Sequence, residues 1–472
     1  MLQHAQTYFV GGRRGKKVPD NFTREEKQQV DDLLDKILVS GNIQAAINEV
    51  RKNKGAPGID KMPVDKLMGY FALNESEVIR SILNKEYKPM PVRRVYIPKP
   101  NSDKLRPLGI PTVVDRVVQQ MVARVLTQEY DPLFSPHSYG FRPNRDCHKA
   151  MAEALGYLNE GRTWIIDFDI EKYFDTVNHD KLISILRENV NDAVILHLIR
   201  SFLKAGVMDD GLVSPTEEGV PQGGPLSPVL SNIYLDKLDK ELEARGLAFV
   251  RYADDFVIFT RSRKSAVRVM KSVTSWIERK LFLRVSPTKT HIVPPSKSEF
   301  LGFGFWKNGS EWKCKPLASR KARLWEKLRA VTCRRKAAAV PLSVTVYKVN
   351  EILRGWINYY RISSMKGFMD LTGQWIRHRI RVVMVKQWKK PKTIMSNLRW
   401  YCTLFHFDFT DEALFKVANS RKGLYAQCNG DVINFILSPK VLGTKLTIGK
   451  GRNRRTVYPG LVNPLAYYLG TT

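Results

Sequence analysis

Acidic side chains end two strand-like stretches of this sequence, and their oxygens are suited to binding a divalent cation. The stretch Phe249–Phe259 reads as two short strands around a tight turn that holds Asp254 and Asp255. Upstream, Thr163–Asp169 reads as a strand that ends in Asp169. Mg²⁺ takes oxygen ligands and keeps several waters, so a few carboxylates and substrate phosphates complete its site. An Asp pair at a hairpin tip is also an ordinary turn, because Asp tolerates turn geometry.

Carboxylates from two strand ends are a ligand set for phosphoryl transfer. Two such ions about 3.5–4 Å apart stabilise both the attacking and the leaving oxygen of the reaction. We therefore predict Asp169, Asp254 and Asp255 as catalytic and metal-binding residues, with two Mg²⁺ ions as cofactors. Whether the two strand ends meet depends on the tertiary structure.

Three motifs, in this order along the chain, resemble the palm motifs of reverse transcriptases. Asp169–Asp175 resembles the first palm motif, Pro221–Pro228 the PQG block and Tyr252–Asp255 the YxDD box. The similarity is greatest to the reverse transcriptase/maturases of bacterial group II introns, and it covers roughly residues 40 to 395. It implies RNA-templated DNA synthesis from a primer 3′-OH, with Asp175 in a structural role.

The same resemblance implies contacts with the incoming nucleotide. Strands expected at Val92–Pro98 and Leu105–Ile110 form a fingers hairpin whose cations neutralise a triphosphate. The aromatic ring of Phe174 in the palm, if it lies under the sugar, would collide with a 2′-OH and favour deoxynucleotides. By residue type alone, the cations are more often solvated surface charges and the phenylalanine is more often a core residue, and a plain turn is the alternative for the block around Gln222. The predicted substrate-binding residues are Lys99 and Arg106 (triphosphate), Phe174 (sugar), Gln222 (nucleotide and template) and Lys289 (pyrophosphate).

Two further positions carry alternatives that the sequence leaves open. Gly223 and Gly224 are expected to let the backbone approach a ligand closely, unless they form a plain turn. Arg142 either contacts the template backbone or pairs with an acid.

The composition indicates a polyanionic partner. The 472 residues include 77 Lys or Arg against 46 Asp or Glu, a net charge of +31. Nucleic acid is the first candidate and an anionic membrane surface the second, but no apolar run of about 18 residues and no apolar signal core are present. The five cysteines lack C-x-x-C spacing, so neither zinc nor disulfides are indicated. A cytoplasmic location is expected.

Residues 311–395 differ in charge from the rest of the chain. They contain 21 Lys or Arg and 4 Asp or Glu, a net charge of +17. Two apolar helical stripes, beginning at Val349 and at Ile376, predict a helical thumb that packs on one side and holds a nucleic-acid backbone on the other. The cations expected around the second stripe are Arg377, Arg379, Arg381, Lys386 and Lys389. Gly355–Arg361 resembles the X (maturase) region of the family.

The predicted fold is α+β, a right-hand polymerase with fingers and palm, an antiparallel palm sheet, an α-helical thumb and a small C-terminal extension. Amphipathic helices are expected at Asn42–Lys52, Val113–Tyr130 and Pro228–Arg245. The predicted domains are a basic N-terminal extension (1–41, with the basic arm Gly11–Lys17), fingers and palm (42–310), thumb or maturase X domain (311–395) and a putatively nucleic-acid-binding extension (396–472).

The predicted function is an RNA-directed DNA polymerase of the group II intron type that also binds intron RNA and assists splicing. Its expected partners are intron or template RNA, a DNA primer or target, and dNTPs, without a membrane. The first alternative is an RNA-binding maturase that acts mainly in splicing. The second is a reverse transcriptase recruited to host defence or to CRISPR adaptation.

Overall fold

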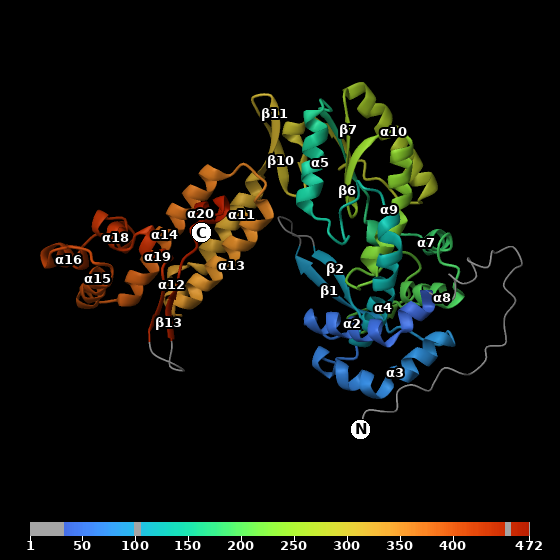
Figure 1. Ribbon diagram of the computed structural model, residues 1–472, viewed down its shortest axis with the longest axis horizontal. Helices are drawn as coiled ribbons and strands as arrows, with labels where there is room; N and C mark the ends of the chain where they lie inside the picture. The colour runs from blue at the N-terminus through green and yellow to red at the C-terminus, as the bar shows by residue number, and fades with distance from the viewer. Residues whose placement is uncertain (1–32, 99–104, 449–454, 472) are drawn as a thin grey trace, which may run out of the picture. The chain divides into compact units, whose positions relative to one another are not determined.

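A computed structural model describes residues 33–98, 105–448 and 455–471, which form two compact units (Figure 1). Unit 1 is Met1–Val293 and unit 2 is Pro294–Thr472, and each is described by itself. Lys99 and the basic arm Gly11–Lys17 lie outside the described residues. The domain boundaries predicted after residues 41, 310 and 395 stay predictions.

Amphipathic helices form the core of unit 1 around a mixed sheet. Thr112 starts α4 (Val113–Tyr130), because its side chain accepts a hydrogen bond from the Asp115 amide. The helical spacing predicted the buried stripe of α2 (Ser40–Lys52) correctly: Ile43, Ala46, Ile47 and Val50. The other helices before the catalytic strands are η1 (Val64–Lys66), α3 (Leu67–Leu83), η2 (Asp131–Leu133) and α5 (Cys147–Asn159).

The first sheet of unit 1 has the strand order β2-β1-β4-β5. The predicted hairpin is present: β1 (Val92–Pro98) pairs antiparallel with β2 (Leu105–Ile110). On its other side, β1 pairs in parallel with β4 (Val207–Asp209), and β4 pairs antiparallel with the edge strand β5 (Leu212–Ser214). The sheet thus joins segments from before and after the first palm motif.

The second sheet is antiparallel throughout, which confirms the predicted palm sheet. Its order is β6-β7-β3-β8. Phe168 on β3 stacks on Phe256 of β7, with ring centroids 4.7 Å apart, so the central pair of strands is held by their side chains as well as by the ladder. The strands are β3 (Trp164–Asp169), β6 (Ala248–Tyr252), β7 (Asp255–Thr260) and β8 (His291–Val293).

Helices flank the palm sheet on its two faces. Val273 and Ile277 of α10 (Arg263–Lys280) join the same core as Phe256, whereas Tyr157 of α5 meets Phe259. The long helix α9 (Ser227–Ala244) buries the predicted stripe of Leu230, Ile233, Tyr234, Leu238 and Leu242. The short helices between the motifs are α6 (Tyr173–Thr176), α7 (His179–Leu186) and α8 (Ala193–Leu203).

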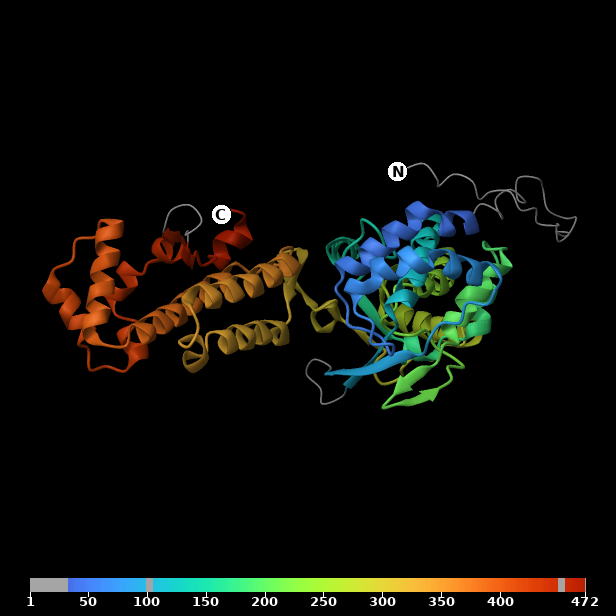
Figure 2. The same cartoon turned by 90° about the horizontal axis from the view of Figure 1, so that it is seen from below.

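Unit 2 begins with a small antiparallel sheet and continues as a helical bundle, which can be followed by colour from gold to red in Figure 2. Trp325 stacks on Phe368 and Trp375, and its indole N–H donates to the Thr372 hydroxyl at 3.1 Å, so aromatic side chains join α11 to α14. The first elements are η3 (Pro295–Lys297), β9 (Glu299–Phe300), β10 (Phe303–Asn308), β11 (Glu311–Pro316), α11 (Ala318–Val331), α12 (Arg334–Ala337), α13 (Leu342–Tyr360) and α14 (Lys366–Trp388).

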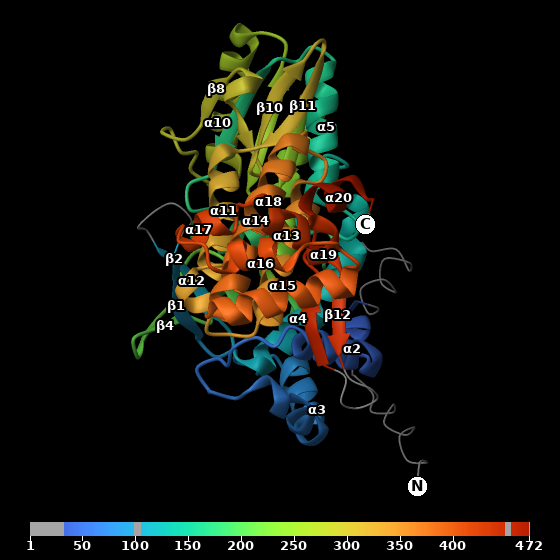
Figure 3. The same cartoon turned by 90° about the vertical axis from the view of Figure 1, so that its left-hand side faces the viewer.

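The C-terminal segment packs back on the bundle. The Asn350 side chain on α13 donates to the Gly460 carbonyl at 2.7 Å and accepts from the Val462 amide at 2.9 Å. The Tyr468 hydroxyl donates to the Ser363 carbonyl. The last residues therefore support the thumb helices. Among the later elements, α15, α16 and α18 gather in one small cluster (Figure 3). The elements are α15 (Pro391–Phe405), α16 (Asp411–Ala418), α17 (Leu424–Gln427), α18 (Asp431–Ile436), α19 (Pro439–Gly443), β12 (Lys445–Ile448), β13 (Arg455–Pro459) and α20 (Pro464–Leu469).

Two of the cations expected to hold nucleic acid from α14 are used inside unit 2 instead. Arg381 is buried, and its Nε donates to the Leu437 carbonyl at 3.0 Å. Arg379 donates to the Thr332 hydroxyl at 2.6 Å. The sequence expectation is wrong for these two because neighbouring helices cover α14, and the two arginines donate to groups at the C-terminal ends of those helices, Leu437 after α18 and Thr332 after α11. In the described part of the chain, no helix is both long and apolar enough to span a bilayer.

Candidate active site

The pairing of the palm strands brings the predicted acids together. Asp169 ends β3 and lies directly opposite Asp255, the first residue of β7. Asp254 belongs to the two-residue turn that joins β6 to β7. Three carboxyl groups that come from sequence positions 85 residues apart thus share one end of one sheet.

The carboxyl groups affect one another electrostatically. Burial raises the pKa of Asp254 and the charge of Asp169 adds to this effect, whereas the charges of Arg106 and Arg251 lower it. Asp255 keeps part of its surface open to solvent, yet the protein crowds its carboxyl group. Desolvation, followed by the charges of neighbouring acids, raises the pKa of Asp255 to about 7. Such crowding of negative charge favours a bound cation.

The segment after α10 contacts the end of β3. The Ser286 amide donates to the Asp169 carbonyl at 2.8 Å, and the Asp169 amide donates to the Thr290 hydroxyl at 3.2 Å. The Lys289 ammonium lies 2.8 and 3.1 Å from the two carboxylate oxygens of Asp169. The lysine predicted to act on pyrophosphate therefore neutralises a predicted catalytic acid in this structure.

The donor set fits Mg²⁺ when substrate oxygens are counted. In the described ranges, no three or more His, Cys, Asp or Glu side chains form a group that would hold a metal ion. Asp169 and Asp254 nevertheless offer partly buried carboxylate oxygens, and the ammonium of Lys289 already lies where positive charge is favoured. Mg²⁺ is commonly held by one or two carboxylates with substrate phosphates and waters, so two acids suffice.

A pocket of about 350 Å³ brings two predicted substrate-binding residues together. Phe174 and Gln222 both line it, beside Arg94 of β1 and the acids Glu217 and Glu218. The Phe174 ring is half-buried and meets Tyr173 edge-on, with centroids 5.1 Å apart. Phe174 therefore packs partly against the core and partly lines the pocket.

The glycines after Gln222 allow their loop to lie very close to other parts of the protein. A Cβ on Gly223 would lie 2.4 Å from the Gly109 carbonyl oxygen on β2, and one on Gly224 would lie 2.2 Å from the side chain of Gln119 on α4. The Gly109 amide also donates to the Gln222 carbonyl at 2.8 Å. The close approach is thus made to β2 and α4, and the expected approach to a ligand stays a prediction.

The remaining predicted residues divide between the fingers hairpin and the loop before α5. Arg106 is exposed on β2, and its charge acts on Asp254. Lys99 lies outside the described residues. Of the two roles left open for Arg142, the pairing with an acid is confirmed: its Nε lies 2.6 Å from Asp131, and the side chain is buried.

Two segments of the chain match known families. Residues 97–305 match the family described as "Reverse transcriptase (RNA-dependent DNA polymerase)", and residues 321–402 match "Group II intron, maturase-specific domain". Protein YkfC of Escherichia coli K12 is 36% identical over 281 residues, which cover 51% of this chain and 73% of YkfC. The chain belongs to the group II intron family of reverse transcriptase/maturases.

Other relatives of this reverse transcriptase are longer than it is. The group II intron-encoded protein LtrA of Lactococcus lactis subsp. cremoris is 30% identical over 353 residues, which are 60% of this chain and 59% of LtrA. The chain thus spans less than two thirds of that protein. A solved "Partial Cas6-RT-Cas1--Cas2 complex" aligns with 28% identity over 52% of this chain and 43% of that chain, at a TM-score of 0.34.

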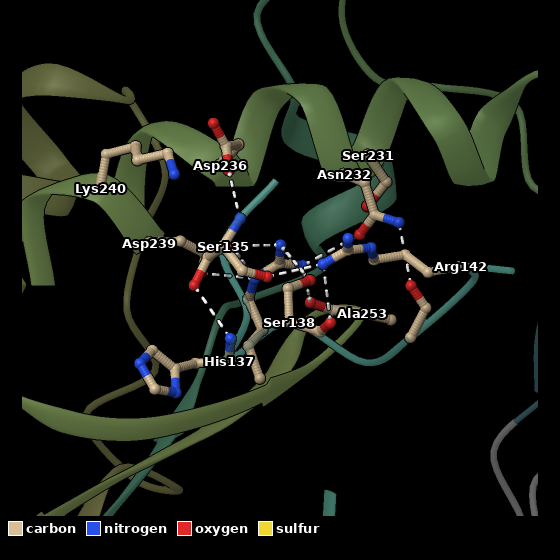
Figure 4. Close-up of polar contacts among 12 residues, drawn as sticks. Ser135, His137, Ser138, Arg142, Ser231, Asn232, Asp236, Asp239, Lys240 and Ala253 are labelled. Carbon is tan, nitrogen blue, oxygen red and sulfur yellow. Dashed lines mark hydrogen bonds and ion pairs between the residues drawn. The ribbon is translucent and has the colours of Figure 1, made fainter. Parts of the chain in front are cut away.

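Sequence reasoning missed a polar network beside the turn between β6 and β7, part of which is drawn in Figure 4. Its centre is Arg251, which is fully buried and ion-paired with the fully buried Asp239 of α9. A signal was present, because a single arginine interrupts the otherwise apolar strand that precedes Tyr252. A charged residue in a buried strand requires a partner.

Asp236, one turn before Asp239 on α9, gives this enzyme a pH-dependent stability. Burial, followed by the charge of Asp239, raises the pKa of Asp236 to about 6. The folded protein therefore keeps a proton that the unfolded chain releases near pH 4, so stability falls as pH rises between these values. We expect Asp236→Asn to stabilise the protein by roughly 1–2 kcal/mol at pH 8 and to lose this advantage toward pH 4.

Thermal unfolding at pH 4.5 and pH 8 measures this effect. Asp180→Asn, at an exposed acid on α7, serves as the control and should change little at either pH. A stability difference for Asp236→Asn that is the same at both pH values would contradict the prediction.

Proposed function

We propose that this chain synthesises DNA on an RNA template by adding dNTPs to a primer 3′-OH at the carboxyl groups of Asp169 and Asp254, with Asp255 beside them. One observation carries the proposal: the strand register sets Asp169 opposite Asp255 and next to the turn that holds Asp254. Membership in the family and the pocket lined by Phe174 and Gln222 support it.

The chain's own groups account for the steps that position the reactants. Asp169 and Asp254 would hold Mg²⁺, which when bound stabilises the attacking and leaving oxygens. Arg106 brings a positive charge from the fingers hairpin, within electrostatic reach of Asp254, where a triphosphate would carry its negative charge. Lys289 neutralises Asp169 in the free enzyme and would turn to the pyrophosphate once metal and substrate occupy the site.

Primer extension tests the proposed activity. The chain is incubated with an RNA template, an annealed DNA primer, dNTPs and Mg²⁺, and products are resolved by length. We expect extension that requires both the RNA template and Mg²⁺ and that stops when a chelator is added. Tight RNA binding without extension under these conditions would instead favour a maturase that acts only in splicing.

We also propose that unit 2 binds intron RNA and assists splicing. A groove of about 470 Å³ lies between α11 and α13. Its α11 side presents Arg320, Arg323 and Lys327, and its α13 side presents Trp356 and Tyr359. Cations beside aromatic rings suit RNA, because the cations neutralise phosphates while unpaired bases stack on the rings. The maturase-specific match over residues 321–402 supports this role.

Replacing Arg323 and Lys327 together with Ala should weaken RNA binding by about tenfold at moderate salt and reduce the salt slope by about 2, since each phosphate contact adds about 1. Fluorescence anisotropy with a labelled intron RNA at several salt concentrations measures both quantities. The control is Lys66→Ala with Lys85→Ala, two exposed lysines of unit 1. An equal loss in the control pair would show a general charge effect and not a binding groove.

A further inference from the structure

The guanidinium of Arg251 is buried and contacts the turn that carries Asp254, and its partners Ser138, Asn232, Asp239 and Ala253 are labelled in Figure 4. Arg251 lies two residues before the turn residue Ala253 in the sequence. The side chains of Arg251 and of its partner Asp239 are both 0% exposed. Every nitrogen of the guanidinium is used. Its Nε donates to both oxygens of Asp239, its Nη1 to the Ala253 carbonyl and to Asn232, and its Nη2 to Asp239 and the Ser138 hydroxyl.

The turn that this arginine contacts is conformationally costly. Ala253 has a φ of +60°, in the left-handed region, which is unfavourable for a residue with a Cβ. Gly140 lies so close to the turn that a Cβ there would be 2.3 Å from the Ala253 nitrogen. Asn232 donates to the Gly140 carbonyl at 2.9 Å, so helix α9 also holds this neighbouring loop. Contacts from outside the hairpin must therefore maintain its shape.

We propose that Arg251 is a positioning residue for Asp254. Its Nη1 holds the Ala253 carbonyl at 2.9 Å, while Asp239 fixes the plane of the guanidinium through two of its nitrogens. The carbonyl of Ala253 belongs to the peptide that leads into Asp254. The hydrogen bond thus fixes the direction of the backbone at Asp254.

The geometry distinguishes this role from simple core stabilisation. A buried ion pair is weak support for stability, since well-packed apolar residues of similar volume often replace it without loss. Here the fork of donors joins three separate segments: the helix through Asp239, the loop through Ser138 and the turn through Ala253. A lysine would give one point charge and would not satisfy all three.

The inference rests on the proposed polymerase function and has a kinetic consequence. A shift of about 1 Å in a catalytic group can reduce the rate by about 100-fold. Arg251 is buried and touches no substrate, so its loss should reduce kcat and leave the KM for dNTP nearly unchanged.

The test replaces the ion pair by apolar residues of similar size, Arg251→Met with Asp239→Leu, so that no buried charge is left alone. Thermal unfolding, primer-extension kinetics and hydrogen–deuterium exchange of the segment 249–256 are measured. We expect a melting temperature close to that of the natural chain, a kcat lower by about 100-fold, a KM within about threefold and faster exchange in the turn. Arg251→Lys should not restore kcat.

The control is Asp180→Asn, which alters an exposed acid on α7 that pairs with Arg200 and does not touch the turn. It should leave kcat and exchange unchanged. Normal kcat and normal exchange in a folded double variant would overturn the positioning role while leaving the polymerase assignment intact.

If the double variant does not fold, Arg251→Gln with Asp239→Asn decides, because it keeps polar side chains at both positions, leaves no buried charge alone and removes the guanidinium that joins Asp239 to the Ala253 carbonyl. We expect about a tenfold loss of kcat with faster exchange in the turn. Natural kcat and natural exchange in this variant would overturn the proposal. If the natural chain extends no primer at all, the proposed function fails, and the exchange data alone decide whether Arg251 holds the turn.

Discussion

Asp254→Asn is expected to abolish primer extension, with a loss of at least about 1,000-fold, while RNA affinity changes by less than about threefold. The variant keeps the size of the side chain but removes one of the carboxylates that would hold Mg²⁺. Burial and the nearby charge of Asp169 raise the pKa of Asp254, so its ionised form is costly without a cation and is stabilised by one. RNA affinity depends on phosphate contacts, which Asp254 does not make.

Extension of a primer on RNA and equilibrium binding of the same RNA measure the two effects side by side. Asp180→Asn is the control, because it removes an exposed acid of α7 that pairs with Arg200 away from the palm strand ends. Equal losses of extension and RNA binding in Asp254→Asn would point to a folding defect. Undiminished extension would remove Asp254 from the catalytic assignment.

Phe174→Ala is expected to let the polymerase use ribonucleotides, raising the ratio of NTP to dNTP incorporation by about 10- to 100-fold. The half-buried Phe174 ring shares the pocket with Gln222 and packs against Tyr173. A ring beside the sugar would exclude a 2′-OH by collision, and alanine would leave room for it. Because the wild-type interaction is repulsive only toward ribose, dNTP incorporation should fall much less than NTP incorporation rises.

Single-nucleotide incorporation rates with matched dNTP and NTP substrates give the ratio directly. Tyr173→Phe is the matched control: it keeps the ring that meets Phe174 and removes only the hydroxyl that donates to the Ser231 carbonyl. A folded Phe174→Ala protein with unchanged sugar selectivity would assign Phe174 to core packing alone.

The sequence by itself determined the elements and the position of the acids at their ends. The buried stripes of α2 and α9 could be predicted because helical spacing puts those side chains on one face whatever lies opposite. Asp169 and Asp254 could be predicted because strand-forming residues stop at them. These are local properties. The prediction that the acids serve a polymerase came from the family resemblance.

Only the tertiary structure decided which of these residues meet. The register opposite Asp255, the ammonium of Lys289 on Asp169, and the pairing of Arg142 with Asp131 all depend on long-range contacts. The same holds for Arg381, whose charge suggested RNA but whose donors satisfy a helix carbonyl. Composition records that a cation is present but not whether water or protein surrounds it.

Arg251 shows the limit most clearly. Its position in an apolar strand signals a need for a partner. The partners all precede it in the sequence, Asp239 by 12 residues, Asn232 by 19 and Ser138 by 113. The free energy of a buried charge depends on the atoms within a few ångströms of it, and these come from three segments that meet only after folding. The sequence therefore predicted that this strand leads into a turn with two acids, and the fold alone decided what holds that turn in place.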